Sequence, residues 1–414
     1  MKFLNFGSCN IDFVYSMDHI VRVGETQASD KLNVFPGGKG LNQSIALSRA
    51  GALVYHAGCI GSDGELLLDT LRESGVDMTY IRRVDEKNGH AIIQVSREGE
   101  NSIFLYAGSN AMISEEYVDS VLENFEKGDY LLLQNEINNI EYIIDKAHER
   151  GMFIVLNPSP ISENILALDF SKLSCIILNE GEMADISGCD DEEEGLALMA
   201  SRYPNLMIML TLGKNGCIYQ FNGNKIFHPI FETVAVDTTA AGDTFTGYFV
   251  SELANKTEIR EILRIASCAS AITVSRHGAA PSIPKRAEVM EALRSMKPQN
   301  TDRSSEIIRS KITAYIDGNT ANATLKGLAA ALGYSPVYAG NVTKKEMGLS
   351  FKKLLQERRL QLAAKMLRDT KNPIGEIIKL AGYENESYFR KMFREKYGMN
   401  PFDYRARYKE GANT

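Results

Sequence analysis

The stretch VDTTAAGDTFTGYF (residues 236–249) places small residues, a glycine and an aspartate at the start of a helical pattern. Asp243 directly follows Ala240, Ala241 and Gly242, and apolar residues at helical spacing come after it. One interpretation is purely structural, because Asp is a favourable N-cap and Gly allows a tight entry into a helix. The other is catalytic, because the amides of a helix N-terminus attract an anion and a nearby carboxylate can accept a proton. The stretch alone does not decide between the two.

Length and composition indicate a globular protein of several domains. The 414 residues predict two or three domains, and 44% hydrophobic and 24% charged residues are typical of soluble chains. No apolar run reaches the roughly 18 residues of a membrane span, and MKFLNFGSCNIDF at the N-terminus lacks the apolar segment of a signal peptide. The 6 cysteines are scattered and form no CxxC pair, which favours reduced thiols and a cytoplasmic location.

Charge divides the chain into two parts. Residues 301–414 carry 21 Lys and Arg against 12 Asp and Glu, whereas the first 300 residues carry 25 against 41. Between the acidic and the basic part lies the polar segment SMKPQNTDRSS (295–305), which has no periodicity. We therefore predict a first domain at 1–295, a linker at 296–305 and a second domain at 306–410, with different partners for the two domains.

The first part alternates between strand patterns and helical patterns. Strand-like runs include AIIQV (91–95), YLLLQ (130–134), FIVLN (153–157), CIILN (175–179) and IMLTL (208–212), with helical segments such as EYIIDKAHERG (141–151) between them. This alternation predicts an α/β domain with a doubly wound, mostly parallel sheet. Polar clusters (QNE, NPSP, NEGE and TLGKNG) follow four of these runs. Because ligands of such sheets bind beyond the carboxyl ends of the strands, we expect the functional site there.

A second candidate motif is FPGGKGLNQSIALSRAG (35–51). Its glycines, Gly37, Gly38 and Gly40, allow close approach of the backbone to a ligand, and the helix predicted from about Asn42 offers amide groups. The motif is not a P-loop, because no Ser or Thr follows Gly-Lys and the glycine spacing differs. Alone, it is compatible with an ordinary turn.

Taken in order, these motifs resemble the ribokinase family of PfkB-type carbohydrate kinases over about residues 1–295. The resemblance rests on NIDFV (10–14), GGKGLNQ (37–43), LLLQNE (131–136), LNPSP (156–160), ILNEGE (177–182), TLGKNG (211–216), VDTTAAGDTFTGYF (236–249) and VSRHGAAPSIP (274–284). It implies ATP-dependent phosphorylation of a sugar, with ribose or a related furanose or pentose as the expected substrate. It also favours the catalytic interpretation of Asp243.

By this resemblance Asp243 is the general base that takes a proton from the primary hydroxyl of the sugar. The backbone amides of Ala240, Ala241, Gly242 and Asp243 would form the anion hole for the transferred phosphoryl group, since this transfer needs mainly positioning and charge stabilisation. The sugar hydroxyls would be bound by Asp12, Gly38, Lys39, Asn42, Glu136 and Asp243. Taken singly, Asp12 could be a turn aspartate and Glu136 a solvated glutamate.

The resemblance also implies ATP, Mg²⁺ and a monovalent cation such as K⁺ as cofactors. The nucleotide-binding residues would be Asn179, Thr211, Gly213 and Gly216. Glu182 would hold Mg²⁺ through water, since this ion takes few protein ligands, although Asn179 and Glu182 could instead be a helix-capping pair. The monovalent cation would lie between two loops and be bound largely through backbone carbonyls, at Asp237, Thr239, Thr273, Arg276, Gly278 and Ser282.

A small β lid is expected next to the sugar site. Residues 13–34 and 89–110 alternate polar and apolar residues in the manner of antiparallel strands. Members of the family use such strands to cover the sugar and to pair with a second subunit. We therefore predict a homodimer that forms through the lid strands.

The second part is predicted to be all-α, with two successive helix-turn-helix units. The second unit (373–405) resembles the AraC-type regulators in its pattern of Ile374, Ile377, Gly382, Tyr383, Ser387, Tyr388, Phe389, Phe393, Gly398, Pro401, Tyr404 and Arg405. Double-stranded DNA is therefore the expected partner. The DNA-facing residues would be Asn341, Lys344 and Lys345 in the first unit and Asn385, Glu386, Arg390, Lys391 and Arg394 in the second. The alternative is an ordinary solvated basic helix.

Three functional hypotheses remain open. The chain could be an active sugar kinase that also regulates transcription, a regulator that uses the kinase fold only as a sugar sensor, or a kinase whose helical tail binds proteins. The presence of Asp243, Glu182 and the glycine motifs favours catalysis, because a pure sensor needs no base. The excess of basic residues in the tail argues against a tail that only binds proteins.

Overall fold

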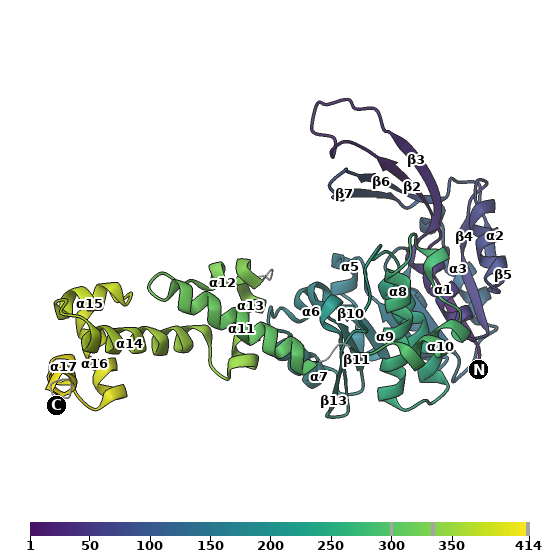
Figure 1. Cartoon of the computed structure of the whole chain (residues 1–414). Coiled ribbons are helices and arrows are strands. Elements are labelled where there is room, and N and C mark those ends of the chain that lie inside the picture. The colour runs from purple at the N-terminus through teal and green to yellow at the C-terminus, as the bar shows by residue number, and fades with distance from the viewer. Residues whose placement is uncertain (299–300, 333–335, 411–414) are drawn as a thin grey trace. The chain divides into compact units, whose positions relative to one another are not determined.

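The chain folds into two compact units, Met1–Gln299 and Asn300–Thr414, in the computed structural model (Figure 1). The structure describes residues 1–298, 301–332 and 336–410. Among these, no helix combines the length and the apolar character needed to cross a membrane. Helix α11 (Thr301–Asn319) begins inside the segment predicted as a linker, so residues 301–305 are helical, whereas residues 299 and 300 lie outside the described part.

The first unit is built on a sheet of nine strands. Its order is β13-β12-β11-β10-β9-β8-β1-β4-β5. The strands are β1 (Phe3–Phe6), β4 (Val54–Ile60), β5 (Asp77–Arg83), β8 (Tyr130–Gln134), β9 (Phe153–Asn157), β10 (Cys175–Asn179), β11 (Met207–Thr211), β12 (Cys217–Phe221) and β13 (Asn224–His228). The seven strands β11, β10, β9, β8, β1, β4 and β5 pair in parallel. In this sheet, β12 pairs antiparallel with β11, and β13 pairs antiparallel with β12. The predicted doubly wound, mostly parallel sheet is confirmed.

Helices cover both faces of this sheet, as Figure 1 shows. One face packs against α1 (Lys39–Arg49), α2 (Glu65–Glu73), α8 (Ala241–Ala254), α9 (Ile259–Val274) and α10 (Arg286–Ser295). The other packs against α3 (Glu115–Leu122), α4 (Ile140–Glu149), α6 (Glu180–Ser187) and α7 (Glu192–Arg202), and the short α5 (Glu163–Leu166) follows β9. Alternate residues of one strand enter different cores: Leu132 faces the α1/α8 side, whereas Leu131 and Leu133 face the opposite side. This explains the continuous apolar runs in the sequence.

A second sheet of four strands forms the lid (Figure 1). Its order is β3-β2-β6-β7, with β2 (Asn10–Ser16), β3 (Lys31–Gly37), β6 (Gly89–Val95) and β7 (Asn101–Tyr106). The run AIIQV belongs to β6 and not to the main sheet. The expectation of antiparallel strands holds within the two hairpins but is wrong for β2 and β6, which pair in parallel. The reason is that the first strand of each hairpin, β2 or β6, lies in the middle of the four-stranded sheet, and these two strands run in the same direction.

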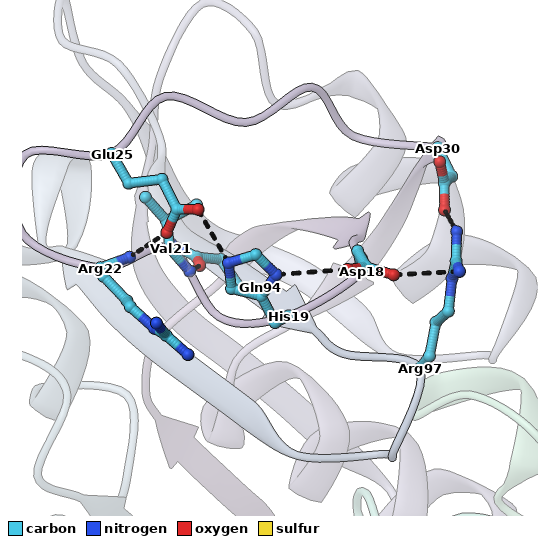
Figure 2. Close-up of polar contacts among 8 residues, drawn as sticks. All are labelled: Asp18, His19, Val21, Arg22, Glu25, Asp30, Gln94 and Arg97. Carbon is cyan, nitrogen blue, oxygen red and sulfur yellow. Dashed lines mark hydrogen bonds and ion pairs between the residues drawn. The ribbon is translucent and has the colours of Figure 1, made fainter.

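The long β2–β3 loop contacts the tip of the other hairpin through exposed ion pairs (Figure 2). Arg97 lies 3.0 Å from Asp18 and 3.6 Å from Asp30, and the ring of His19 bridges Glu25 at 2.9 Å and Asp18 at 3.3 Å. The hydrogen bonds that the His19 ring donates to the carboxylates of Glu25 and Asp18 raise the pKa of His19. Exposed pairs of this kind are individually weak, so they hold the loop on the other hairpin with little energy.

The second unit is all-helical, as predicted. Its helices are α11, α12 (Leu325–Leu332), α13 (Pro336–Met347), α14 (Phe351–Asp369), α15 (Ile374–Leu380), α16 (Glu386–Tyr397) and α17 (Pro401–Glu410). Two small cores form: α11 to α13 pack with the start of α14, and α15 to α17 pack with its end. The long helix α14 therefore joins two helix-turn-helix units. Residues 333–335, between α12 and α13, lie outside the described part.

The contact between α1 and α8 depends on Gly247. A Cβ atom at this position would lie 2.4 Å from Cβ of Ala46 and 2.8 Å from its backbone carbon, which is far inside van der Waals distance. Both helices are buried at this point, so neither can move away without disturbing the core.

We predict that Gly247→Ala destabilises the first unit. Overpacking costs about 1–3 kcal/mol and should outweigh the roughly 1 kcal/mol that Ala gains over Gly in a helix. Calorimetric unfolding measures the change. Gly318→Ala in α11 is the matched control, because nothing lies within 4 Å of that position. A Gly247→Ala variant as stable as the native chain would contradict the close packing of α1 and α8.

Candidate active site

Two cavities meet at the carboxyl ends of the parallel strands. The larger, about 910 Å³, is lined by residues of the lid and of α1, and the smaller, about 210 Å³, by the ends of β9, β10 and β11. Lys39, Thr238, Ala240 and Asp243 line both of them. A group can therefore pass from a ligand in one cavity to a ligand in the other beside Asp243.

Asp243 lies in the first turn of α8 and is 7% exposed. The helix begins after Ala240, which has a left-handed backbone conformation with φ 60°, an uncommon and strained state for a residue with a side chain. Oδ2 of Asp243 accepts a hydrogen bond from Nδ2 of Asn42 at 3.0 Å, and Oδ1 accepts one from Nε2 of Gln43 at 2.9 Å. Helix α1 thus holds both oxygens of the carboxylate.

The start of α8 offers backbone amides to the smaller cavity. Ala241, Gly242 and Asp243 all line it, and the first amides of a helix have no partner within the helix. The amide of Ala241 donates only a long hydrogen bond, 3.3 Å, to the carbonyl of Thr238. A Cβ atom added at Gly242 would have no neighbouring atom from another part of the protein within 4 Å. The space beside the start of α8 is therefore open. The positive end of the helix can bind an anionic group here.

Two acidic residues face the larger cavity. Glu136 accepts hydrogen bonds from Oγ of Ser8 at 2.5 Å and from the backbone amide of Lys39 at 2.9 Å, so it is not a solvated surface glutamate. Burial raises the pKa of Glu136, although Ser8 and Lys39 oppose the effect. Burial, and secondly the charge of Glu136, raise the pKa of Asp12 to about 7. Asp12 lies within strand β2 and not in a turn.

Lys39 supplies the positive charge at the junction. Burial alone would lower its pKa, but the carboxylates of Asp243, Glu136 and Glu182 together raise it above the ordinary value. The ammonium group therefore stays charged. Lys39 lies where a ligand in one cavity would approach a ligand in the other. Gly38, with φ 92°, allows the backbone turn that places Lys39 at this junction.

Asn179 and Glu182 form a complete capping box at the start of α6. Oδ1 of Asn179 accepts from the amide of Glu182, and Oε2 of Glu182 accepts from the amide of Asn179, both at 2.9 Å. The capping interpretation is therefore confirmed, yet both residues also line the smaller cavity together with Thr211. The buried carboxylate of Glu182 is held in place and fits a role in orienting the waters of a Mg²⁺ ion.

The two predicted nucleotide-binding glycines lie outside the smaller cavity. Gly213 and Gly216 belong to the turn between β11 and β12 and are not among the residues that line the smaller cavity. Gly216, with φ 107°, has a packing reason of its own, since a Cβ there would lie 2.2 Å from the carbonyl oxygen of His228.

The loops predicted to hold a monovalent cation lie against each other. Asp237 joins them: Oδ1 accepts from the amide of Thr239 at 2.9 Å, and Oδ2 accepts from the amide of Gly278, also at 2.9 Å. The remaining side chains of the set are engaged within the protein. Oγ1 of Thr273 bonds Thr244, the guanidinium of Arg276 pairs with Glu288, and Oγ of Ser282 donates to Ala279. Within the described residues, no group of three or more His, Cys, Asp and Glu side chains could hold a metal ion.

The sequence analysis missed several polar residues around the two cavities. Gln43 holds Asp243, Ser8 holds Glu136, and Asn10 and His277 line the larger cavity. Gln43 and Asn10 stand next to motif residues, at GGKGLNQ and NIDFV, and that adjacency was the available signal. Nothing in the sequence marks Ser8.

In the second unit, α13 and α16 carry the residues expected to face DNA. Lys344, Lys345, Arg390, Lys391 and Arg394 are exposed, while Asn341 is half-buried. Phe389 and Phe393 of α16 are fully buried, and Met392 and Tyr397 on the same helix are half-buried. Asn385 is the N-cap of α16, since its Oδ1 accepts from the amide of Tyr388 at 2.8 Å, and Glu386 pairs with Arg390. Three of the expected residues, Asn385, Glu386 and Arg390, therefore also have structural partners within the helix.

Comparison with known proteins agrees with both units. Residues 2–286 match the pfkB family carbohydrate kinases, and residues 328–407 match a helix-turn-helix domain. The ribokinase of Haemophilus influenzae is 36% identical over 299 residues, covering 69% of this chain and 96% of its own length, and that of Bacillus subtilis is 33% identical over 291 residues, with 69% and 97% covered. The structure of Arabidopsis thaliana ribokinase complexed with ribose and ATP has a TM-score of 0.63 at 27% identity, with 71% and 98% covered.

The chain therefore belongs to the pfkB family of carbohydrate kinases. More particularly, its first unit is a carbohydrate kinase with the ribokinase-like fold, and its second unit is a helix-turn-helix domain of AraC type.

We predict that Asp12 makes stability depend on pH. Its pKa is 3.8 ordinarily and about 7 in the folded chain, so the folded state holds the proton more tightly, and stability falls as the pH rises from about 4 to 7 and is level above that. Asp12→Asn should therefore stabilise the first unit at pH 8.5 by on the order of 2–4 kcal/mol, and by about half as much at pH 5.5. Thermal unfolding of both chains at the two pH values measures this. Exposed Asp69→Asn is the control, and an Asp12→Asn effect that does not change with pH would contradict the raised pKa.

Proposed function

We propose that the first unit transfers the γ-phosphoryl group of ATP to the primary hydroxyl of ribose or a related pentose or furanose. The observation that carries this proposal is the position of Asp243 and Lys39 on the walls of both cavities. The relatives named above as ribokinases support ribose as the first substrate to test.

In this proposal the sugar lies in the larger cavity, with its hydroxyls bound by Asp12, Asn42 and Glu136. Asp243 accepts the proton of the attacking hydroxyl, because its carboxylate is held at the junction. Lys39 and the amides at the start of α8 stabilise the negative charge of the transferred group. Bound Mg²⁺ would neutralise the phosphates, with Glu182 orienting its waters, and a monovalent cation between the loops at Asp237 and Gly278 would support the same helix end.

The proposal predicts that Asp243→Asn lowers kcat by about 10²–10⁴-fold, because the base is lost. Nucleotide binding should remain, since the amides of the helix are unchanged. Steady-state kinetics with ribose and other pentoses, together with calorimetric titration of ADP, measure both effects. Asp185→Asn, an exposed position on α6, is the matched control. A kcat of Asp243→Asn equal to that of the native chain would show that Asp243 is not the base.

We further propose that the second unit binds operator DNA, and that the chain is a sugar kinase that also regulates transcription in the cytoplasm. A homodimer through the lid is part of this proposal. Its support is Phe104 and Tyr106 on the edge strand β7, which are 56% and 48% exposed and lie on the face of the strand opposite to Ile103 and Leu105, which line the larger cavity. Two DNA-binding units per dimer would suit a paired operator. A regulator that uses the kinase only as a sugar sensor is the second candidate, and the presence of Asp243 with its two amide partners argues against it.

For the DNA-binding unit we predict that Arg390→Ala weakens binding to duplex DNA. Selection of DNA sequences on the full chain supplies the probe, and fluorescence anisotropy across a salt series measures affinity. Each phosphate contact should contribute about −0.9 to the log–log salt slope, and loss of a bidentate base contact should relax preference at one position at a cost of about 1–3 kcal/mol. Arg407→Ala, exposed on α17, is the control.

The same titration tests regulation when it is repeated with saturating sugar. Coupling between two sites is typically 5–150-fold in affinity, and the sugar should change DNA affinity by a factor in this range. Equal affinities with and without sugar would show two independent units. Affinity that does not change with salt would contradict DNA binding itself.

A further inference from the structure

Gln43 lies directly behind the carboxylate of Asp243 and outside both cavities. Its side chain is fully buried, with 0% exposure, and it lines neither the larger nor the smaller cavity. It therefore cannot touch a sugar or a nucleotide. Its Nε2 nevertheless donates to Oδ1 of Asp243 at 2.9 Å, on the oxygen that Asn42 does not bind.

The orientation of the Gln43 amide is determined by its other partners. Nε2 also donates to Oδ1 of Asn157 at 3.0 Å, and Oε1 accepts from Nε2 of Gln134 at 2.7 Å. A rotated amide would place its oxygen against two acceptors and its nitrogen against a donor, which is unfavourable in a buried site. Gln43 can thus donate to Asp243 in only one arrangement.

These partners are themselves anchored to the sheet. Nδ2 of Asn157 donates to the carbonyl of Ile177 in β10 at 2.9 Å, and Nε2 of Gln134, at the end of β8, also donates to Oδ1 of Asn5 in β1 at 2.9 Å. Asn5 in turn donates to the carbonyl of Gly40, at the start of α1. The carboxylate of Asp243 is therefore connected through Gln43 to strands β1, β8 and β10.

A carboxylate that acts as a base must direct one lone pair at the hydroxyl. Rotation about its Cβ–Cγ bond moves both oxygens, and one hydrogen bond from Asn42 alone would leave this rotation loosely restrained. A second donor on the other oxygen fixes the plane of the group. A small misplacement of reacting groups can cost about 10²-fold in rate.

We propose that Gln43 is a positioning residue, which fixes the plane of the Asp243 carboxylate so that its free lone pair faces the sugar hydroxyl. The inference rests on the proposed role of Asp243 as the base. It predicts a specific effect on the chemical step, because Gln43 touches neither substrate.

The test is Gln43→Met, which keeps the length of the side chain but removes the donor to Asp243 without placing a second carboxyl group beside it. We expect kcat to fall by about 10–100-fold while the KM for the sugar changes less than about 3-fold, since the sugar contacts remain. Loss of a donor to the charged carboxylate should also move the acid limb of the pH–rate profile upward by about one pH unit. A merely structural residue would lower stability without moving this limb.

Two further variants make the outcome decisive. Ser48→Ala on the same helix, where Oγ bonds the carbonyl of Ser74, should leave kcat and the pH profile unchanged. Gln134→Leu, which releases the acceptor end of Gln43, should lower kcat by about 3–10-fold at an unchanged KM, and it decides the question if Gln43→Met does not fold. Native kcat and an unmoved acid limb in the folded variants, or a change in KM alone, would overturn the proposal. Asp243→Asn measured in parallel separates this result from failure of the base assignment itself.

Discussion

The contact between helices α1 and α8 is the constraint on which the active site depends. Asn42 and Gln43 on one helix reach Asp243 on the other only because Gly247 lets the two backbones come together over Ala46. Gly40 has a comparable role at the start of α1, where an added Cβ would lie 2.3 Å from the amide nitrogen of Ser8. Two motifs about 200 residues apart in the sequence are thereby brought into hydrogen-bonding distance. Packing between helices, and not the loops alone, determines where the carboxylate of Asp243 points.

The same packing concentrates negative charge, at a cost to stability. The carboxylates of Glu136, Glu182 and Asp243 act on one half-buried lysine, Lys39, and burial raises the pKa of both Asp12 and Glu136. Groups of like charge in a partly dry site destabilise the folded state unless a ligand or a cation compensates them. This is the pattern expected of a site that binds a polyol and transfers a phosphoryl group. A sensor of an uncharged sugar would need only part of it.

Local motifs in the sequence predicted much of this site, and tertiary packing explains what they did not. Asp243, the glycines of GGKGLNQ and the parallel sheet follow from patterns within about 15 residues, so they could be read from one sequence. The role of Gln43 could not, because it depends on the distance between α1 and α8. The parallel pairing of β2 with β6 depends on which strands of two distant hairpins are innermost. Capping and metal binding at Glu182 are not exclusive alternatives. One carboxylate oxygen caps the helix, and the other is available for a second role.

In the proposed function α16 is the helix that enters the DNA groove, and an ion pair on its surface would take part in binding. Arg390 pairs with Glu386 one turn earlier in α16, and both side chains are exposed. An exposed pair at this spacing stabilises a helix by only about 0.3–0.5 kcal/mol, whereas a bidentate contact of arginine with guanine contributes about 1–3 kcal/mol of discrimination. The arginine can therefore leave Glu386 for a base at small cost, and until then the pair limits the conformations that its long side chain samples. The residual carboxylate of Glu386 would then face the groove, where it repels phosphate and accepts a hydrogen bond from the amino group of cytosine. The pair thus disfavours non-specific binding more than it opposes binding to a matching site.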